Sequence, residues 1–404
     1  MLTPSLALLI SIIIILILIR VKVPVGFAVF GGSLILSLLV LPWIETPSLM
    51  LKTITDYQTI KLLVVIACAL TMSSLMESRG MLAQLAHALE RLNPKLALHI
   101  VPAVIGFIPM TAGSVVSAIA SHDLVKKVGI NPEQSTFINY WFRHIWEYSI
   151  PTFAAIITAG ALLSVPLSKI TATMFPATLL AIGAGAIVSH SILKKFPAAN
   201  GKPSKNMAII FIKAAWPIIL LVILILAGVD AIIAFPAVLV LLVIQQRPRW
   251  KELGKALKFG LDPKTLFLLY AVMLYKTTME SANVAYAVMI DMQSIGLPVV
   301  VIVAFLPFLI GMVTGISVAI VGITFPLLMP FLTSGGELNS IAVLLAYGSG
   351  IIGMMLSPVH LCLILSAEYF KADLLKVYKY LLLPAAIVLA VLVLTFSISF
   401  YILH

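Results

Sequence analysis

The most constraining feature of this chain is a pattern that occurs twice, about two hundred residues apart. In each copy a Met-Glu-Ser tripeptide precedes a segment of glycine and hydroxyl residues, and a proline follows: 76–78, 111–114 and Pro151 in the first, 279–281, 314–317 and Pro358 in the second. Glu77 and Gly113 are 36 residues apart, and Glu280 and Gly315 are 35 apart. Matched apolar segments interrupted by Gly and Pro in two halves of a chain indicate the midplane site of a secondary transporter.

The composition places this pattern in a membrane. Of the 404 residues, 62% are hydrophobic and 10% are charged, whereas a soluble domain is typically about 45–50% apolar. The first apolar stretch, 6–19, runs into Arg20 without a small-residue cleavage site, so we interpret it as a membrane helix. We expect a multi-pass protein of the cell (inner or cytoplasmic) membrane. Cys68 and Cys362 lie within apolar runs and are interpreted as buried small hydrophobic residues.

About twenty apolar residues cross a bilayer as a helix. On that basis we predict an all-α polytopic membrane protein with about ten crossings and two re-entrant hairpins. The crossings are expected near 4–20, 24–43, 59–76, 136–163, 168–192, 208–227, 230–245, 265–280, 340–366 and 378–402, and the hairpins near 96–122 and 297–334. The polar stretch 194–206 separates a first repeat, 1–200, from a second repeat, 201–404, and neither is expected to fold alone.

The basic residues predict the orientation. Of the 26 Lys and Arg, twenty fall in the loops and helix ends on one side of the predicted membrane. The opposite side holds only four, Lys52, Lys61, Lys169 and Lys276, and the remaining two, Arg143 and Lys213, lie inside spans. Cytoplasmic loops carry the excess of basic residues, which puts both termini outside the cell. The net charge of +11 then points to anionic lipid as a partner at the cytoplasmic face and not to nucleic acid.

Five crossings and one hairpin in each half make the second repeat inverted relative to the first. The first hairpin should therefore open from the cytoplasm and the second from outside. Between the third helix and the hairpin of each half lies an intermediate stretch, 79–92 and 282–294, which suits a helix in the membrane interface.

This order of elements resembles the ion transporter superfamily, which includes divalent anion/sodium symporters, gluconate and citrate permeases and some sodium/proton antiporters. Residues 136–147 (TFINYWFRHIWE) and 356–362 (LSPVHLC) look like a prokaryotic branch of that superfamily of unknown function. The resemblance covers essentially the whole chain. It implies a homodimer, a fixed scaffold with a mobile transport domain, an elevator mechanism and a site between the two hairpin tips. The symporters carry Ser-Asn-Thr at each tip, and this chain lacks the Asn, so sodium and the proton both stay candidates for the coupling ion.

The tips and the two prolines are the first part of the predicted binding site: Thr111, Gly113, Ser114, Thr314, Gly315, Ser317, Pro151 and Pro358. Irregular backbone persists at membrane depth only where protein or a water-filled cavity satisfies it. Helix ends at such a tip offer N–H groups to an anion and carbonyls to a cation. The alternative interpretation is small-residue helix packing and simple proline kinks.

The two copies differ most before the proline. Asn139, Arg143, His144 and Glu147 in the first copy correspond to Ala346, Gly350, Ile351 and Met354 in the second. A charge at this depth is a functional hypothesis by default, and the planar fork of Arg143 suits a carboxylate or phosphate. Alternatively, Arg143 and Glu147 form a structural pair, since they are four residues apart on one helix.

His144 and His360 come from opposite copies and are predicted to converge, so either could carry a coupled proton. Metal ligation would need a spaced set of carboxylates, which the sequence lacks, so we predict no metal site and no cofactor, with a sodium ion as the one candidate. Phosphate-loop, nucleophile-elbow and HExxH motifs do not occur, so we predict that the chain is not an enzyme.

The sequence thus predicts a secondary transporter for a small organic anion, coupled to a proton or sodium gradient. A sodium/proton antiporter of the same superfamily is the nearest alternative, although Glu147 is the main deep acidic residue and has Arg143 beside it. An ion channel would need a continuous polar pore, and a membrane enzyme has little to support it.

Overall fold

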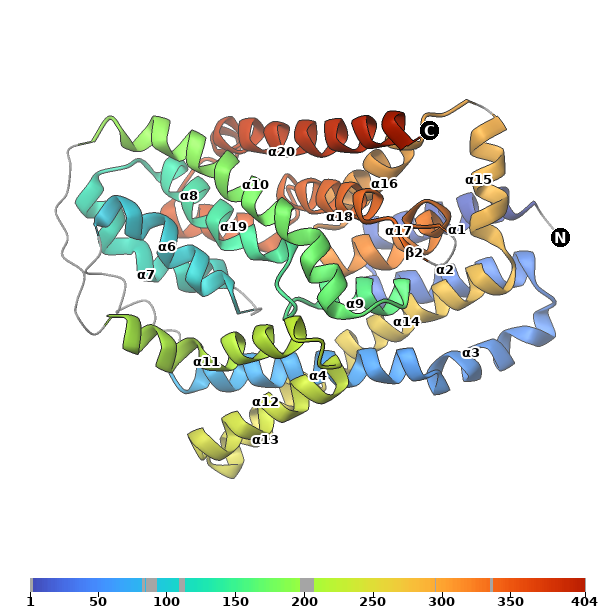
Figure 1. Ribbon diagram of the computed structural model, residues 1–404, viewed down its shortest axis with the longest axis horizontal. Coiled ribbons are helices and arrows are strands. Elements are labelled where there is room, and N and C mark those ends of the chain that lie inside the picture. Colours follow the sequence, from blue (N-terminus) through green and yellow to red (C-terminus); the bar gives the residue numbers. More distant parts are fainter. Residues whose placement is uncertain are drawn as a thin grey trace.

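The computed structural model describes residues 3–81, 84, 93–108, 113–196, 207–294, 296–334 and 337–403, nearly all of them in helices (Figure 1). The first half contains α1 (Pro4–Arg20), α2 (Val25–Val40), the 3-10 turn η1 (Trp43–Glu45), α3 (Thr46–Thr55), α4 (Tyr57–Ser78), α6 (Pro94–Gly106), α7 (Gly113–Val128), α8 (Pro132–His144), the 3-10 turn η2 (Ile145–Tyr148), α9 (Ala154–Leu163) and α10 (Leu167–Leu193).

The second half repeats this order. It contains α11 (Met207–Leu226), α12 (Ala231–Gln246), α13 (Trp250–Gly260), α14 (Pro263–Ser281), α15 (Val284–Ser294), α16 (Val299–Thr314), α17 (Ser317–Leu332), β1 (Thr333–Ser334), β2 (Glu337–Leu338), α18 (Ser340–Met355), α19 (Leu361–Phe370) and α20 (Leu374–Leu403). The two short strands form an antiparallel pair after α17.

Local signals set the helix starts in both halves. Asp56 accepts a hydrogen bond from the backbone N–H of Thr59 at the start of α4, and Asp262 does the same for Thr265 at the start of α14. At the start of α8, Asn131 and Gln134 form a reciprocal capping box. Each cap satisfies an N–H group that has no partner within its own helix.

The contacts between helices are reciprocal across the two halves. The second helix of each half packs against the third long helix of the other, α2 on α14 and α12 on α4. The first helix of each hairpin packs on the broken helix of its own half, α6 on α8 and α16 on α18. The second helix of each hairpin contacts the other half, α7 on α19 and α17 on α9. The hairpins and broken helices of both halves therefore form one packed unit.

Two glycines allow the hairpins to approach the broken helices closely. A Cβ atom on Gly106 of α6 would overlap the carbonyl oxygen of Arg143 in α8, and one on Gly311 of α16 would overlap the carbonyl oxygen of Gly350 in α18. Arg143 and Gly350 are the positions that correspond when counted back from Pro151 and Pro358. The two hairpins thus rest on equivalent places of the two broken helices.

Most predicted elements coincide with helices of the structure. Helix pairs α6–α7 and α16–α17 lie where the hairpins were expected, and α15 falls within 282–294. The expected crossings at 136–163 and 340–366 are each divided in two, by the segments 149–153 and 356–360 that contain the prolines. Most of the other expected interfacial stretch, 79–92, lies outside the described residues.

The number of membrane crossings stays a prediction. Within the described part of the chain, four helices are long and apolar enough to cross a bilayer, in α4, α10, α11 and α20. The helices α1, α2 and α12 are apolar but have 16 or 17 residues. Two helices were not predicted at all, α3 and α13, which pack against α14 and α4 respectively. Both are short and follow the second helix of their half.

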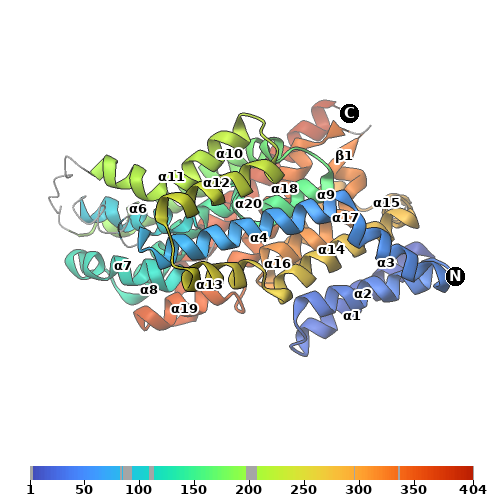
Figure 2. The same cartoon turned by 90° about the horizontal axis from the view of Figure 1, so that it is seen from below.

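The long helices run roughly along the longest axis of the molecule, and α15 runs across them (Figures 1 and 2). Both chain ends lie toward the end of the molecule where α15 lies, and α7 lies at the opposite end. The broken helices are central: every residue of α8 from Ser135 to His144 is buried, as is nearly every residue of α18. Polar side chains on α8 are therefore held in the interior.

Candidate functional site

The second hairpin tip directly contacts the second helix break. Gly315 ends α16 with a φ of +64°, a left-handed conformation that favours glycine. Its Cα faces the backbone of His360, since a Cβ there would come within 3.1 Å of the His360 Cα. The Ser357 hydroxyl donates to the Met312 carbonyl at 2.7 Å, which ties the same break to α16. The tip and the break therefore form one structural unit.

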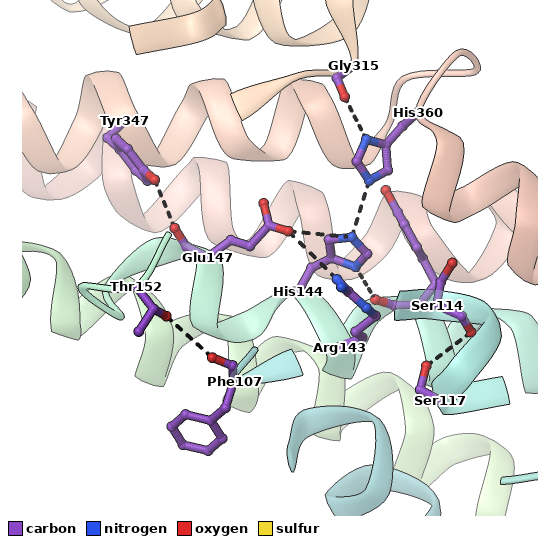
Figure 3. Close-up of polar contacts among 11 residues, drawn as sticks. Phe107, Ser114, Ser117, Arg143, His144, Glu147, Thr152, Gly315, Tyr347 and His360 are labelled. Atoms are coloured by element: carbon purple, nitrogen blue, oxygen red, sulfur yellow. Dashed lines mark hydrogen bonds and ion pairs between the residues drawn. The ribbon is translucent and has the colours of Figure 1, made fainter. Parts of the chain in front are cut away.

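Two histidines from opposite halves meet here (Figure 3). The Nε2 atoms of His144 and His360 are 3.2 Å apart. On the far side of each ring, Nδ1 of His144 is 2.6 Å from the Tyr140 carbonyl and Nδ1 of His360 is 2.7 Å from the Gly315 carbonyl. A carbonyl can only accept, so both Nδ1 atoms carry the hydrogen and both Nε2 atoms present a lone pair in the neutral ring.

Arg143 and Glu147 lie beside this pair. The Arg143 side chain is 2% exposed and its Nη1 is 3.9 Å from Glu147 Oε1, a long separation for an ion pair. The same oxygen is 3.7 Å from His144 Nε2. Figure 3 shows the Glu147 carboxylate directed toward both side chains. The guanidinium is thus buried but only loosely paired.

Asn139 connects the first hairpin with the second half. Its Nδ2 donates to the Ser114 carbonyl at 3.0 Å and to the Ser366 hydroxyl of α19 at 2.7 Å. Ser114, the last residue of the predicted tip, lies in the first turn of α7. The first turn of α7 is therefore fixed relative to both α8 and α19.

Carbonyls near the helix breaks accept from buried tyrosines. The Tyr140 hydroxyl donates to the Met355 carbonyl at 3.0 Å, and the Tyr347 hydroxyl donates to the Glu147 carbonyl at 2.9 Å. Helix ends leave carbonyls without an internal partner, and a buried carbonyl needs one. Each tyrosine also links the broken helix of one half to that of the other.

Three buried polar atoms of this region have no hydrogen-bond partner among the described residues: Ser114 Oγ, Asn139 Oδ1 and Arg143 Nε. Buried polar atoms are nearly always paired, so an exception needs an explanation such as a ligand. The three atoms are a hydroxyl oxygen, a guanidinium nitrogen and an amide oxygen, so they offer two donors and one acceptor.

The remaining predicted residues are placed as follows. Thr111 lies outside the described residues. The Thr314 hydroxyl donates to the Ile310 carbonyl of its own helix at 2.7 Å, and Ser317 is the first residue of α17. Pro151 is buried, whereas Pro358 is exposed and takes no direct part in the buried cluster. Gly113 begins α7 and is buried beside Ser114.

Sequence reasoning missed several residues of the cluster. Cys362, interpreted as a small hydrophobic residue, has its Sγ within 4.8 Å of one ring nitrogen of His144 and one of His360. Ser366, Tyr140 and Tyr347 also take part in the contacts. Cys362 follows His360 by two residues, which is the one local signal that could have identified it.

The fold and the buried polar cluster define a nearly all-helical membrane protein built from two similar halves, with paired hairpins that meet broken helices at its centre. The chain belongs to the family described as "Protein of unknown function (DUF401)", whose model matches residues 3–399. A comparison of the sequence with curated proteins returned no match.

A solved structure shares the fold. The YdaH transporter of Alcanivorax borkumensis, whose crystal structure is described as having an unusual topology, superposes with a TM-score of 0.63. The two chains are 13% identical, and the match covers 89% of each. At this identity the similarity concerns the fold.

Proposed function

We propose that this protein is a secondary active transporter that carries a small organic anion, a carboxylate, driven by a proton or sodium gradient. The observation that carries the proposal is Arg143, a buried cation whose Nε has no partner among the described residues. Burying a charge is costly unless it is paired, and a bound carboxylate would complete its hydrogen bonds. The fold shared with a protein described as a transporter supports the same function.

In this proposal the anion binds between the first turn of α7 and α8. Arg143 donates to the carboxylate through its fork, and the Ser114 hydroxyl donates to a second oxygen. Asn139 Oδ1 accepts from a hydroxyl of the substrate or from a protonated carboxyl group. The positive end of the α7 dipole at Gly113 adds to the attraction for negative charge.

We place the coupling proton between His144 and His360. Two neutral imidazoles whose Nε2 lone pairs face each other at 3.2 Å repel unless a cation lies between them. A single proton converts this contact into a charge-assisted hydrogen bond. Because His144 belongs to the first half and His360 to the second, protonation would pull the two broken helices together.

A sodium/proton antiporter is the second candidate. Such a protein would bind its ions at Glu147, the carboxylate within the cluster, without an organic substrate. Glu147 Oε1 lies near both Arg143 and His144, and a single carboxylate among nitrogen donors is a poor site for a hard cation such as sodium, which takes oxygen ligands. The cluster therefore favours an anion over sodium alone.

We further propose that the hairpins and broken helices move as one unit against α1, α2, α11 and α12 in a homodimer. The reciprocal packing of the hairpins on the broken helices supports a single moving body. Light scattering of the protein in detergent tests the dimer, and a monomeric mass would contradict it.

A thermal-stability screen of the purified protein tests the anion proposal. Mono- and dicarboxylates, phosphonates and their neutral amide counterparts are added separately, and unfolding is followed in detergent. A ligand that binds only the folded protein stabilises it by about 2.7 kcal/mol at a hundred times its Kd. We expect at least one carboxylate to raise the melting temperature and its amide to have no effect. Stabilisation by sodium or pH alone, with no anion active, would favour the antiporter.

A further inference from the structure

A third donor lies beside the two histidines. The Sγ of Cys362 and one ring nitrogen each of His144 and His360 all lie within 4.8 Å of one another. His144 ends α8, His360 immediately precedes α19, and Cys362 lies in the first turn of α19. Cys362 is a free thiol. Two imidazoles and one thiol thus converge from the two halves of the chain.

The hydrogen bonds of both rings match those of metal-bound histidines. Metal-ligating histidines generally donate their other N–H to a carbonyl or carboxylate, which fixes the tautomer and directs the lone pair. Here Tyr140 and Gly315 provide those carbonyls at 2.6 and 2.7 Å. Both Nε2 atoms are therefore aimed at the same space, with their orientation set by backbone groups.

The spacing of the donors also fits a tetrahedral site. Zinc–nitrogen and zinc–sulfur bonds of about 2.0–2.3 Å place neighbouring ligand atoms roughly 3.3–3.7 Å apart. The two Nε2 atoms are 3.2 Å apart. Glu147 Oε1, at 3.7 Å from His144 Nε2, is within the same range. The thiol lies within 4.8 Å of the ring nitrogens and needs to approach by about 1.5 Å at most to reach the ideal spacing.

We propose that His144, His360 and Cys362 bind a divalent transition metal ion of the zinc class, with Glu147 as the fourth ligand. Imidazole, thiolate and carboxylate are the ligands that Zn²⁺ takes in proteins. This inference stands on the donor geometry and does not depend on the identity of the transported anion. The metal occupies the space that we assign to the proton, so the two are alternative occupants.

The charges of the cluster accommodate the ion. Cys362 loses its proton on metal binding, so thiolate and Glu147 together offset the divalent charge. The Glu147 oxygen lies near both the Arg143 guanidinium and His144, and its charge reduces the repulsion between Arg143 and the metal. The remaining positive charge of Arg143 stays available to an anion.

Cobalt(II) binding to the full-length protein in detergent tests the proposal, because a Co²⁺–thiolate bond gives an intense ultraviolet charge-transfer band. We expect one Co²⁺ per chain with this band, displaced by Zn²⁺ and not by Mg²⁺, which prefers oxygen ligands. Cys362→Ser should abolish the band and weaken binding at least about tenfold. Cys68→Ser removes the other cysteine, which lies on α4 outside the cluster, and should leave the band unchanged.

His360→Gln is the second variant, and it should also weaken Co²⁺ binding while His122→Gln, at an exposed position, should not. Monodispersity on gel filtration shows that each variant is folded. The proposal is overturned if the wild-type protein shows no thiolate band, or if Cys362→Ser binds Co²⁺ with unchanged affinity and spectrum. Equal losses in Cys68→Ser and Cys362→Ser would likewise contradict it.

Discussion

Arg143→Lys should weaken binding of the anion roughly 10- to 150-fold while the protein stays folded. Lysine keeps the positive charge but loses the fork, and a hydrogen bond to a charged group contributes about 1.5–3 kcal/mol. Ligand-induced thermal stabilisation measures the affinity. Arg79→Lys is the matched control, because Arg79 is partly exposed and pairs with Glu252 at 3.2 Å, away from the cluster. The Arg79→Lys variant should bind the anion with the same affinity as the wild type.

Neutral replacements separate the binding role of Arg143 from a structural one. Arg143→Met leaves Glu147 buried beside an apolar side chain, so both stability and affinity should fall. The double change Arg143→Met with Glu147→Gln removes both charges and should recover stability without recovering affinity. If Arg143→Lys and this double variant both bind the anion as the wild type does, the pair is structural. His144, His360 and Ser114 would then have to hold the anion without it.

Gly106→Ala and Gly311→Ala should each destabilise the protein by about 1–3 kcal/mol, because a methyl group cannot fit against the facing carbonyl without displacing the hairpin. Gly183→Ala is the control: Gly183 lies within α10, and a Cβ there meets no atom within 4 Å. This change should be neutral or stabilising by up to about 1 kcal/mol, since alanine favours helix.

Thermal unfolding in the same detergent compares the three glycine variants. Gly106→Ala should also lower anion affinity, because Gly106 rests on the backbone of Arg143 and its displacement shifts the guanidinium. Gly311 rests on Gly350, which has no side chain in the cluster, so Gly311→Ala should affect stability more than anion affinity. Stability of Gly106→Ala and Gly311→Ala equal to that of Gly183→Ala would show that the hairpins do not depend on this close approach.

The helices and breaks of this fold could be predicted within a few residues because their signals are local. Apolar runs, glycines and the two prolines marked α6 to α9 and α16 to α19, and counting back from the prolines identified Arg143 and Gly350 as equivalent. The helices α3 and α13 were missed because 10 or 11 residues with mixed polarity do not resemble a membrane span. Predictions on Thr111 and on most of 79–92 fall outside the described residues.

The cluster itself could be predicted only in part. His144 and His360 were expected to converge, and the structure places their Nε2 atoms 3.2 Å apart. Ser366 and Tyr347 have no local pattern that distinguishes them from core residues, because their roles come from contacts with residues about two hundred positions away. For Cys362 the one local signal is its position two residues after His360. The orientation in the membrane and the identity of the anion rest on charge distribution and chemistry and stay predictions.

The most direct test of the account is uptake of the stabilising anion into proteoliposomes. We expect saturable accumulation above the external concentration when an inward proton or sodium gradient is imposed. Uptake should collapse when the gradient is dissipated and be absent in the Arg143→Met, Glu147→Gln double variant. Proton-for-sodium exchange without movement of the anion would show an antiporter, non-saturating flux that follows voltage would show a channel, and chemical conversion of the anion would show an enzyme. Any of these three results would contradict a gradient-driven anion transporter with Arg143 at its binding site.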